Sequence, residues 1–315
     1  MTSPSLEAIN LTKKYGSFTA LSKLNLKLEG SKCVGFLGPN GAGKTTTLKI
    51  FTDMIRPTGG MALINGIDVN KEKKKALKSV GVLIETPEIY GSLSAREALS
   101  MIAEIKGISR ASVRKSVEDV SELVKMKGLL NQKIKKMSKG MKQRINIAAA
   151  ILGNPEIVIL DEPTSGLDPR GMSEVRDIIK DLKKENRLIF MSSHLLSEVS
   201  EICDDVAMIN HGKLLAYGPI EKIVEKFSKV GAVEVEVNLF RPVTGDTIDR
   251  LRNIKGVRSV KKVDSKTVLL QVIGGLKGQE EVLSRLVRIK LGIVGFKQSS
   301  SALEETYLSM FKETV

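Results

Sequence analysis

The sequence predicts an α/β fold with a second, smaller domain, and three observations lead to that prediction. The short apolar run 32–37 leads directly into the glycine-rich segment 38–46. A second run, Ile157–Leu160, is β-branched and apolar on both faces, as in a strand covered by helices, and it ends in two carboxylates. Beyond residue 232 the composition changes, and 233–239 alternates strictly between apolar and polar residues. The first two features predict a sheet flanked by helices, and the third predicts a separate unit.

The glycine-rich segment fits the pattern G-x-x-x-x-G-K-[ST] between a strand and a helix start, which is the context that this motif requires. Its glycines let successive backbone N–H groups face phosphate oxygens, and the helix N-terminus adds partial positive charge. The lysine of the pattern reaches the β- and γ-phosphates, and the next hydroxyl contacts Mg²⁺. We therefore expect a bound nucleoside triphosphate. The expected contacts are Gly38, Pro39, Asn40, Gly41, Ala42, Gly43, Lys44, Thr45 and Thr46.

Length and composition narrow the class of protein. The 315 residues, 42% of them hydrophobic, suffice for about two domains with real cores. Two cysteines far apart in the sequence, Cys33 and Cys203, indicate a reduced protein with two buried thiols rather than a disulfide. The N-terminus lacks the features of a secretory signal. No apolar run approaches the roughly 20 residues of a membrane span, so any work at a membrane is expected from outside the bilayer.

The net charge of +14 implies polyanionic partners, such as a nucleotide, a nucleic acid or an anionic lipid surface. Basic residues cluster at 71–78 and at 125–144, and the second cluster contains no acidic residue. A solvated helix face explains such clusters equally simply. Aromatic residues make up only 4% and tryptophan is absent, so the stacking platforms of single-strand binders are missing. No nucleic-acid partner is expected.

The first elements in the chain are strands. Residues 7–12 and 21–28 alternate between apolar and polar, with a turn at Gly16. Tyr15 lies in that turn, where its ring has two interpretations: stacking on a purine, or an ordinary half-exposed turn residue. Residues 61–70, with Asn65-Gly66 as a turn signal, predict a hairpin.

A Lys-rich helix from Lys71 and a buried strand over 80–84 follow, and Glu85 ends that strand, with Pro87 breaking the pattern. Ser94 to Glu97 reads as the capping box of a helix. Residues 95–130 are helical by period, with a break near Gly107.

Another helix opens in the segment 138–144, with Ser138 as its N-cap. A serine and Gly140 at a helix N-terminus form a second phosphate-sized anion site, or a plain N-cap.

The strand 157–160 ends in Asp161 and Glu162, at the strand edge where an α/β ATPase holds its metal. Asp161 is expected to approach Mg²⁺ and Glu162 to orient the attacking water; the alternative is a solvated acidic pair. A turn at 164–169 and a helix over 171–185 come next. The buried strand 188–191 then leads to His194, which either donates to the γ-phosphate or is a satisfied turn histidine.

The remaining chain is predicted as a hairpin, a linker and a small domain without a catalytic cluster, interpreted as a regulatory or docking domain. Leu303, Tyr307, Leu308 and Phe311 share one face of its final helix. The expected elements are the hairpin 206–217, a helical linker 219–232, strands 233–239, 257–263, 267–273 and 293–297, and helices 247–253 and 280–291.

Five of these elements follow in one order: Tyr15, the loop 38–46, the segment 137–144, residues 157–162 with 165–168, and His194. This order resembles the ATP-binding subunits of ABC transporters, and the likeness covers about residues 5–218. The serine–glycine helix start before the second carboxylate motif is peculiar to that superfamily. The resemblance implies a P-loop NTPase core with a RecA-like sheet, an antiparallel β subdomain and an inserted α-helical subdomain. The implied boundaries are 1–218 for this domain, about 86–153 for its helical part, 219–232 for the linker and 233–315 for a small C-terminal α+β accessory domain.

The resemblance also implies roles. Two such subunits pair head to tail and trap two ATP molecules with Mg²⁺, so each site is completed by the partner. Tyr15 then stacks on adenine. The implied residues are Lys44, Glu162 and His194 for catalysis; Thr45, Glu85 and Asp161 for the metal; and Ser138, Lys139, Gly140 and Asp168 for ATP bound by the partner.

Two positions depart from the family pattern. Glu85 stands where the family usually has glutamine, which adds negative charge beside the phosphates. Lys139 replaces a glycine of the signature and adds positive charge near the partner's nucleotide. Similar variants occur in drug- and peptide-resistance exporters whose ATPase is encoded apart from its permease, and the segment 301–308 resembles the C-terminal extension of that branch.

The sequence thus predicts an ATPase subunit of an ABC transporter that powers transport, in the export direction, through a separately encoded integral-membrane permease. It is expected in the cytoplasm, peripheral on the inner face of the cell membrane, paired with a second ATP-binding subunit (a homodimer or a close paralogue). One alternative is a soluble ABC ATPase acting on ribosomes or nucleic acid, but translation factors of that kind carry two cassettes and this chain has one. The other is a nucleotide-gated binding module with little turnover, which Glu85 and Lys139 make conceivable.

Overall fold

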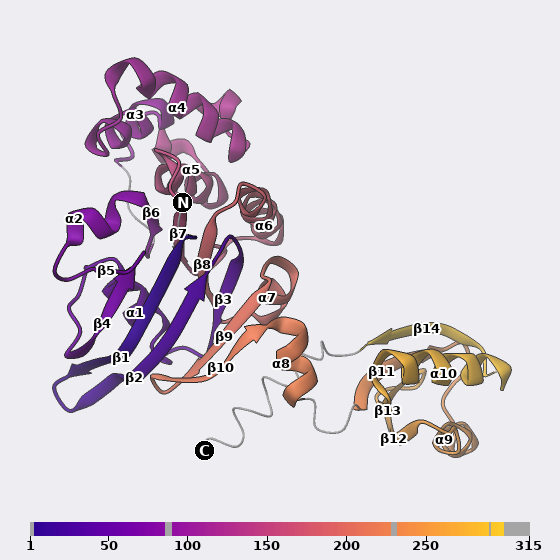
Figure 1. Ribbon diagram of the computed structural model, residues 1–315. Helices are drawn as coiled ribbons and strands as arrows, with labels where there is room; N and C mark the ends of the chain where they lie inside the picture. Colours follow the sequence, from indigo (N-terminus) through magenta and orange to yellow (C-terminus); the bar gives the residue numbers. More distant parts are fainter. Residues whose placement is uncertain (1–2, 86–89, 228–231, 290, 299–315) are drawn as a thin grey trace. The chain divides into compact units, whose positions relative to one another are not determined.

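The computed structural model describes residues 3–85, 90–227, 232–289 and 291–298. The chain forms two compact units, Met1–Pro219 and Ile220–Val315 (Figure 1).

An antiparallel sheet in the first unit contains the predicted N-terminal strands, in the order β2-β1-β4-β5. Asn65 and Gly66 join β4 to β5 with positive φ at both positions, as a type I′ hairpin turn requires, which confirms the predicted hairpin. Tyr15 is the last residue of β1 and pairs with Phe18, so it precedes the turn and does not lie in it. The strands are β1 (Ser5–Tyr15), β2 (Phe18–Glu29), β4 (Gly59–Ile64) and β5 (Ile67–Asp68).

A second sheet of six strands has the order β10-β9-β3-β8-β7-β6, and all its pairs are parallel except β9 with β10. Every residue of β3, β7, β8 and β9 is buried, as the apolar runs predict. Because β3, β8 and β7 are parallel neighbours, the loops that follow them emerge at one edge of the sheet. The strands are β3 (Cys33–Leu37), β6 (Val80–Leu83), β7 (Ile157–Asp161), β8 (Leu188–Ser193), β9 (Asp205–Asn210) and β10 (Lys213–Pro219).

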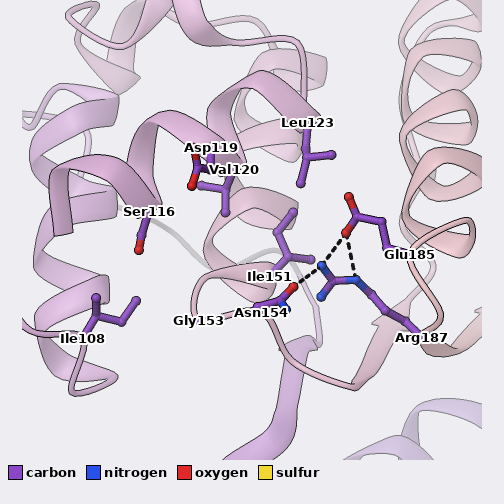
Figure 2. A pocket seen from close by; sticks show the side chains of 10 residues that line it. All are labelled: Ile108, Ser116, Asp119, Val120, Leu123, Ile151, Gly153, Asn154, Glu185 and Arg187. Carbon is purple, nitrogen blue, oxygen red and sulfur yellow. Dashed lines mark hydrogen bonds and ion pairs between the residues drawn. The ribbon is translucent and has the colours of Figure 1, made fainter. Parts of the chain in front are cut away.

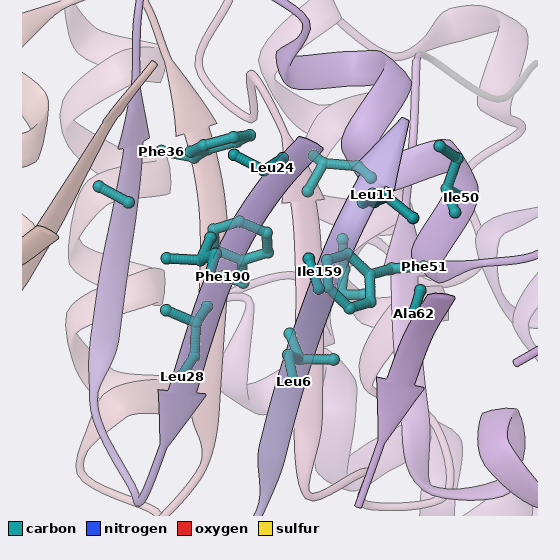
Figure 3. Packing of buried hydrophobic residues seen from close by; sticks show 14 of the residues in the cluster. Leu6, Leu11, Leu24, Leu28, Phe36, Ile50, Phe51, Ala62, Ile159 and Phe190 are labelled. Atoms are coloured by element: carbon teal, nitrogen blue, oxygen red, sulfur yellow. The ribbon is translucent and has the colours of Figure 1, made fainter. Parts of the chain in front are cut away.

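Helix α1 (Lys44–Phe51) contributes to the hydrophobic core that joins the two sheets. In this core Leu6 and Leu28 of the antiparallel sheet meet aromatic side chains from α1 and the parallel sheet (Figure 3). The ring of Phe190 lies 5.1 Å from that of Phe36 and packs edge-on against Phe51 at 6.3 Å between centroids. The glycine-rich loop is therefore anchored at both ends, because β3 and α1 are both part of one core.

Three helices of the first unit lie together: α3 (Ala95–Ile105), α4 (Arg110–Leu123) and α5 (Lys139–Ile151) (Figure 1). The C-terminal end of α5 packs on β6, where a Cβ at Gly81 would lie 2.4 Å from the Ala150 carbonyl oxygen. The capping box of Ser94 and Glu97 and the break at Gly107, where φ is +80°, confirm the predictions. The Lys-rich helix, α2 (Lys73–Ala76), starts two residues later than predicted and spans only four residues. Helices α6 (Pro169–Lys183) and α7 (Leu196–Ile202) follow β7 and β8.

The second unit begins with α8 (Ile220–Phe227), inside the predicted helical linker, and continues as an antiparallel sheet in the order β12-β13-β11-β14. Its chain order is β-α-β-β-α-β, a split βαβ arrangement of α+β type. Val237, Leu270 and Leu286 lie in its core. The elements are β11 (Ala232–Leu239), α9 (Gly245–Arg252), β12 (Val257–Lys262), β13 (Thr267–Ile273), α10 (Gly275–Arg288) and β14 (Ile293–Gln298).

Helix α10 begins five residues before the predicted start at 280. Gly274 and Gly275 resemble a turn in the sequence, but Gly274 is the left-handed N-cap of this helix. Position 278, inside the helix, requires glycine, because a Cβ there would lie 2.0 Å from the carbonyl oxygen of Ile273. The break predicted at Pro87 and the final helix predicted to carry Leu303, Tyr307, Leu308 and Phe311 lie outside the described residues.

Both cysteines are free and buried, as predicted, and their Sγ atoms lie 3.5 Å apart although 170 residues separate them. Within the part of the chain that the structure describes, no helix has the length and apolar character needed to cross a bilayer.

Candidate nucleotide site

The glycine-rich loop lies between β3 and α1 and packs tightly on its neighbours. A Cβ at Gly38 would come within 2.4 Å of the Ile209 carbonyl oxygen, and one at Gly43, where φ is +107°, within 2.8 Å of the Ala20 carbonyl oxygen. Neither position can hold a side chain without displacing backbone. The loop between them contains Pro39, Asn40, Gly41 and Ala42, and Thr46 lies in the first turn of α1.

Lys44 places a buried ammonium group at the centre of this loop. Its side chain is 5% exposed, and Nζ donates to the carbonyl oxygens of Gly38 at 2.7 Å and Pro39 at 3.1 Å. Burial lowers the pKa of Lys44, and the nearby carboxylates of Glu162 and Asp161 partly offset that effect. A cation held by its own loop in this way is positioned to exchange carbonyl oxygens for phosphate oxygens.

Asp161 joins β7 to the loop and to β8. Its Oδ1 accepts from the hydroxyl of Thr45 at 3.2 Å and from that of Ser192 at 2.5 Å. The Ser192 hydroxyl in turn accepts from the backbone N–H of Glu162 at 2.9 Å. Ser192 carries no local sequence signal, because its role comes from its register opposite Asp161 in the neighbouring parallel strand. This serine fixes both acidic residues at the end of β7.

The oxygens of Thr45 and Asp161 are the hard ligands that Mg²⁺ prefers, and Mg²⁺ usually takes only one or two protein groups beside phosphate and water. The residues therefore fit this ion. Glu85, the third metal residue implied by the resemblance, has its carboxylate 2.6 Å from Nζ of Lys49 on α1. In the structure the partner of the Glu85 carboxylate is therefore Lys49, whereas Asp161 accepts from Thr45 and Ser192. Among the described residues no group of three or more histidines, cysteines and carboxylates is placed to hold a metal.

The three residues implied for catalysis lie together. One oxygen of the Glu162 carboxylate is 3.6 Å from Nζ of Lys44, and the other is 3.1 Å from Nδ1 of His194. Glu162 has a φ of +43°, a conformation that a non-glycine residue adopts only when its surroundings impose it. The carboxylate is thus held between two nitrogen donors at the edge where the γ-phosphate of a bound nucleotide would lie.

A second polar surface is formed by the N-termini of α5 and α6. Ser138 caps α5 by accepting from the N–H of Met141, and Asp168 caps α6 by accepting from that of Gly171. The two helix starts pack closely, since a Cβ at Gly140 would lie 3.6 Å from Cα of Gly171. The N-cap role predicted for Ser138 is confirmed.

Lys139 extends from this surface over the segment that follows β7. A Cβ at Gly166 would lie only 2.3 Å from its Nζ. Ser138, Lys139 and Asp168 are all exposed. The structure therefore groups the residues implied for the partner's ATP on one exposed surface.

Tyr15 is 49% exposed at the end of β1, and Nζ of Lys13 lies 4.9 Å from the centre of its ring. Strand β2, which pairs with β1, contacts the glycine-rich loop through Ala20 and Leu21 at Gly43.

A pocket of about 420 Å³ lies elsewhere, between α4 and the residues that precede β7 and β8 (Figure 2). It is at the opposite edge of the sheet from Asp161. Its guanidinium, that of Arg187, is bonded to Asn154 and Glu185 and to the Pro155 carbonyl oxygen. This pocket has a cation already satisfied by protein groups, so it is not the site for a triphosphate.

Comparison with known proteins gives the family of this chain. A protein-family model described as ABC transporter matches residues 21–165. The bacitracin transport ATP-binding protein BcrA of Bacillus licheniformis is 41% identical over 225 residues, which are 71% of this chain and 72% of the relative. This chain belongs to the ABC transporter ATP-binding family. It is an ATP-binding ATPase of that family, with the P-loop NTPase fold.

The likeness to another ABC ATPase extends through the C-terminal unit. The uncharacterized ABC transporter ATP-binding protein YhcH of Bacillus subtilis is 32% identical over 98% of this chain and 96% of its own length. Among solved structures, an ATP-binding subunit of an ABC transporter superposes with a TM-score of 0.64 at 28% identity, over 71% of this chain and 93% of that one. The dimeric post-hydrolysis structure of an ATP-binding cassette with ADP and Pi shares the fold, with a TM-score of 0.61 at 24% identity over 68% of this chain and 98% of that one.

Proposed function

We propose that this ABC ATPase hydrolyses ATP in sites shared between two subunits and thereby powers export through a separately encoded membrane permease. The observation that carries the proposal is the division of the site residues into two groups on one chain. Lys44, Thr45, Asp161, Glu162 and His194 surround the glycine-rich loop. The other group is the exposed surface at the starts of α5 and α6.

In the first group Lys44 binds the β- and γ-phosphates of ATP in place of the loop carbonyl oxygens. Thr45 and Asp161 hold Mg²⁺, which when bound offsets the charge of the phosphate oxygens. Glu162 orients the attacking water and accepts its proton, because Ser192 holds its backbone N–H and its carboxylate lies between Lys44 and His194. His194 donates to the γ-phosphate through Nε2, a role that requires a proton on each ring nitrogen while Nδ1 contacts Glu162. Tyr15 supplies an exposed ring for the adenine base.

In the second group Ser138 and Gly140 present a helix N-terminus to the γ-phosphate bound by the partner subunit. Lys139 adds a positive charge beside it, and Asp168 contacts the same site. The charge added by the other departure from the family pattern, Glu85, is compensated locally. Lys49 neutralises the carboxylate of Glu85, so this residue need not repel the phosphates.

We further assign residues 1–218 to the ATP-binding domain, with a helical subdomain at about 86–153, and 233–315 to an accessory domain that docks or regulates. The partners are an integral-membrane permease and a second ATP-binding subunit, either another copy or a close paralogue. The assembly is placed at the inner face of the cell membrane, on the cytoplasmic side. A transport role is supported by the bacitracin-transport relative.

The proposal is tested by measuring ATP hydrolysis with and without a candidate membrane permease, identified by co-purification with this chain and reconstituted in liposomes. We expect stimulation by the permease. The variant Glu162→Gln is expected to lose at least about 100-fold in kcat while still binding ATP and accumulating as a dimer. Normal turnover in that variant would contradict the role of Glu162. Stimulation by RNA that ignores the permease would contradict the transport function.

A further inference from the structure

Glu198, on α7, is a buried carboxylate that the steps above do not use. Its side chain is 2% exposed. One oxygen accepts from the hydroxyl of Thr164, and the other accepts from that of Ser193 at 2.8 Å. Thr164 is 2% and Ser193 1% exposed, so the whole cluster is shielded from water. Breaking either bond would leave a buried charge with one partner fewer, so the three residues move together or at high cost.

One hydroxyl lies in the loop after β7, and the other is on the last residue of β8, directly before the loop that carries His194. Thr164 lies two residues after Glu162 and begins the segment that ends at Asp168. Ser193 precedes His194, and its hydroxyl also accepts from the N–H of Leu195 at 2.9 Å, which fixes the turn that presents the histidine. Glu198 therefore links the loop after β7 to the loop after β8.

Helix α5 is tied to the same loop. Gln143, 7% exposed and three residues after Gly140, donates from Nε2 to the carbonyl oxygen of Pro163 at 2.6 Å. Pro163 is the residue before Thr164. A continuous path thus runs from the helix that carries Ser138 through Gln143, the Pro163–Thr164 backbone, Glu198 and Ser193 to His194.

We propose that Glu198 is a positioning residue that couples the two half-sites of each subunit. Resting on the proposed function, it holds His194 and Glu162, which act on the subunit's own ATP, in register with Ser138 and Asp168, which reach the partner's ATP. Engagement of α5 by the partner's nucleotide then changes the placement of His194, because the path consists of hydrogen bonds between buried groups that are costly to break. Coupling between sites is carried by contiguous hydrogen-bond networks and packed elements of this kind, and the double-mutant cycle below measures it.

The first test is Glu198→Gln in the full chain, assayed for ATP turnover. The amide keeps the shape but removes the charge, and its NH₂ group can meet one of the two hydroxyls only as a donor, so one of the two charge-assisted bonds must reverse and both weaken. We expect kcat to fall about 10- to 100-fold through misplacement of His194, with KM for ATP changed less than about 2-fold. The matched control is Glu185→Gln, the same change in the Arg187 cluster at the far edge of the sheet, which is expected to leave kcat unchanged. Equal kcat in wild type and Glu198→Gln would overturn the proposal.

Conservative variants separate positioning from folding. Thr164→Ser keeps the hydroxyl and is expected to retain activity near the wild-type level, whereas Thr164→Val is expected to lose kcat as Glu198→Gln does. If Glu198→Gln does not fold, this pair alone decides the question. Equal activity of the two threonine variants would overturn the proposal.

A double-mutant cycle tests the coupling between the ends of the path. Gln143→Met and Ser193→Ala alter residues that do not touch, so independent effects would add. We expect the double variant to lose little more kcat than the worse single variant. Additive losses would refute a shared path. Wild-type turnover and the loss in Glu162→Gln are measured alongside, because their absence would refute the proposed function itself.

Discussion

Replacing Ser192 with alanine tests how the metal residues are held. Its hydroxyl is fully buried, donates to Asp161 at 2.5 Å and accepts from the N–H of Glu162 at 2.9 Å. The substitution removes a hydrogen bond to a charged group, worth about 1.5–3 kcal/mol, and one between neutral groups, worth about 1 kcal/mol. We therefore expect the free energy of unfolding to fall by about 2.5–4 kcal/mol.

The functional consequence is larger than the loss of stability suggests. Asp161 loses the partner that orients it toward Thr45, and residues that support metal ligands typically contribute 10- to 100-fold to metal affinity or activity. We expect the Mg²⁺ concentration for half-maximal ATPase activity to rise about 10-fold or more in Ser192→Ala.

The assay is a Mg²⁺ titration of ATPase activity at saturating ATP, beside urea unfolding of the apoprotein. Ser121→Ala is the matched control, because Ser121 is equally buried but donates only to the Val117 carbonyl oxygen in α4. It is expected to lose about 1 kcal/mol and to keep the wild-type Mg²⁺ requirement. An unchanged Mg²⁺ requirement in Ser192→Ala would refute the reasoning.

Three further predictions concern lysine side chains. Lys49→Met leaves the charge of Glu85 uncompensated and should raise KM for ATP. The free energy of unfolding should fall by under about 1 kcal/mol, since the pair is partly exposed. Adding Glu85→Gln should restore KM, and an unrestored KM would contradict the pairing of Lys49 with Glu85. Lys139→Gly in the Glu162→Gln background should weaken the ATP-driven dimer about 10-fold and flatten its salt dependence, both measured by sedimentation; unchanged salt dependence would place Lys139 away from the nucleotide. Lys106 donates to three carbonyl oxygens at the end of α5, and burial lowers its pKa to about 8. In the unfolded state the pKa of Lys106 is near 10.5, so between pH 8 and 10.5 the unfolded state holds a proton that the folded state has lost. The free energy of unfolding of wild type relative to Lys106→Met should therefore rise with pH over that range. A fall with pH over that range would contradict the lowered pKa.

Local motifs made the site predictable where backbone and chemistry coincide in one segment. The glycines of the loop 38–46 predict its conformation. The runs that become β7 and β8 are hydrophobic enough to be recognised as buried strands, with Asp161 at the end of the first and His194 directly after the second. Because parallel neighbours end at one edge, the sequence also implied that these residues would meet.

Pairings between distant segments were not predictable in this way. Ser192 supports Asp161 because β7 and β8 have one specific register, which no local pattern specifies. Lys49 meets Glu85 across 36 residues, and Glu198 looks in the sequence like an ordinary helix carboxylate although it is buried between two loops. The residues that touch substrate are marked by motifs, whereas those that position them are found only from tertiary contacts.

The central claim is that each ATP site is shared by two subunits, and mixing two inactive variants tests it most directly. Lys44→Ala removes the phosphate-binding lysine, and Ser138→Arg blocks the α5 surface, so each variant alone has no intact site. In a mixed dimer one site combines the intact glycine-rich loop of one subunit with the intact α5 of the other. The account predicts that mixing restores ATPase activity to about a quarter of the wild-type level, because about half of the dimers are mixed and each has one working site. Activity that stays at the sum of the two separate variants would contradict it.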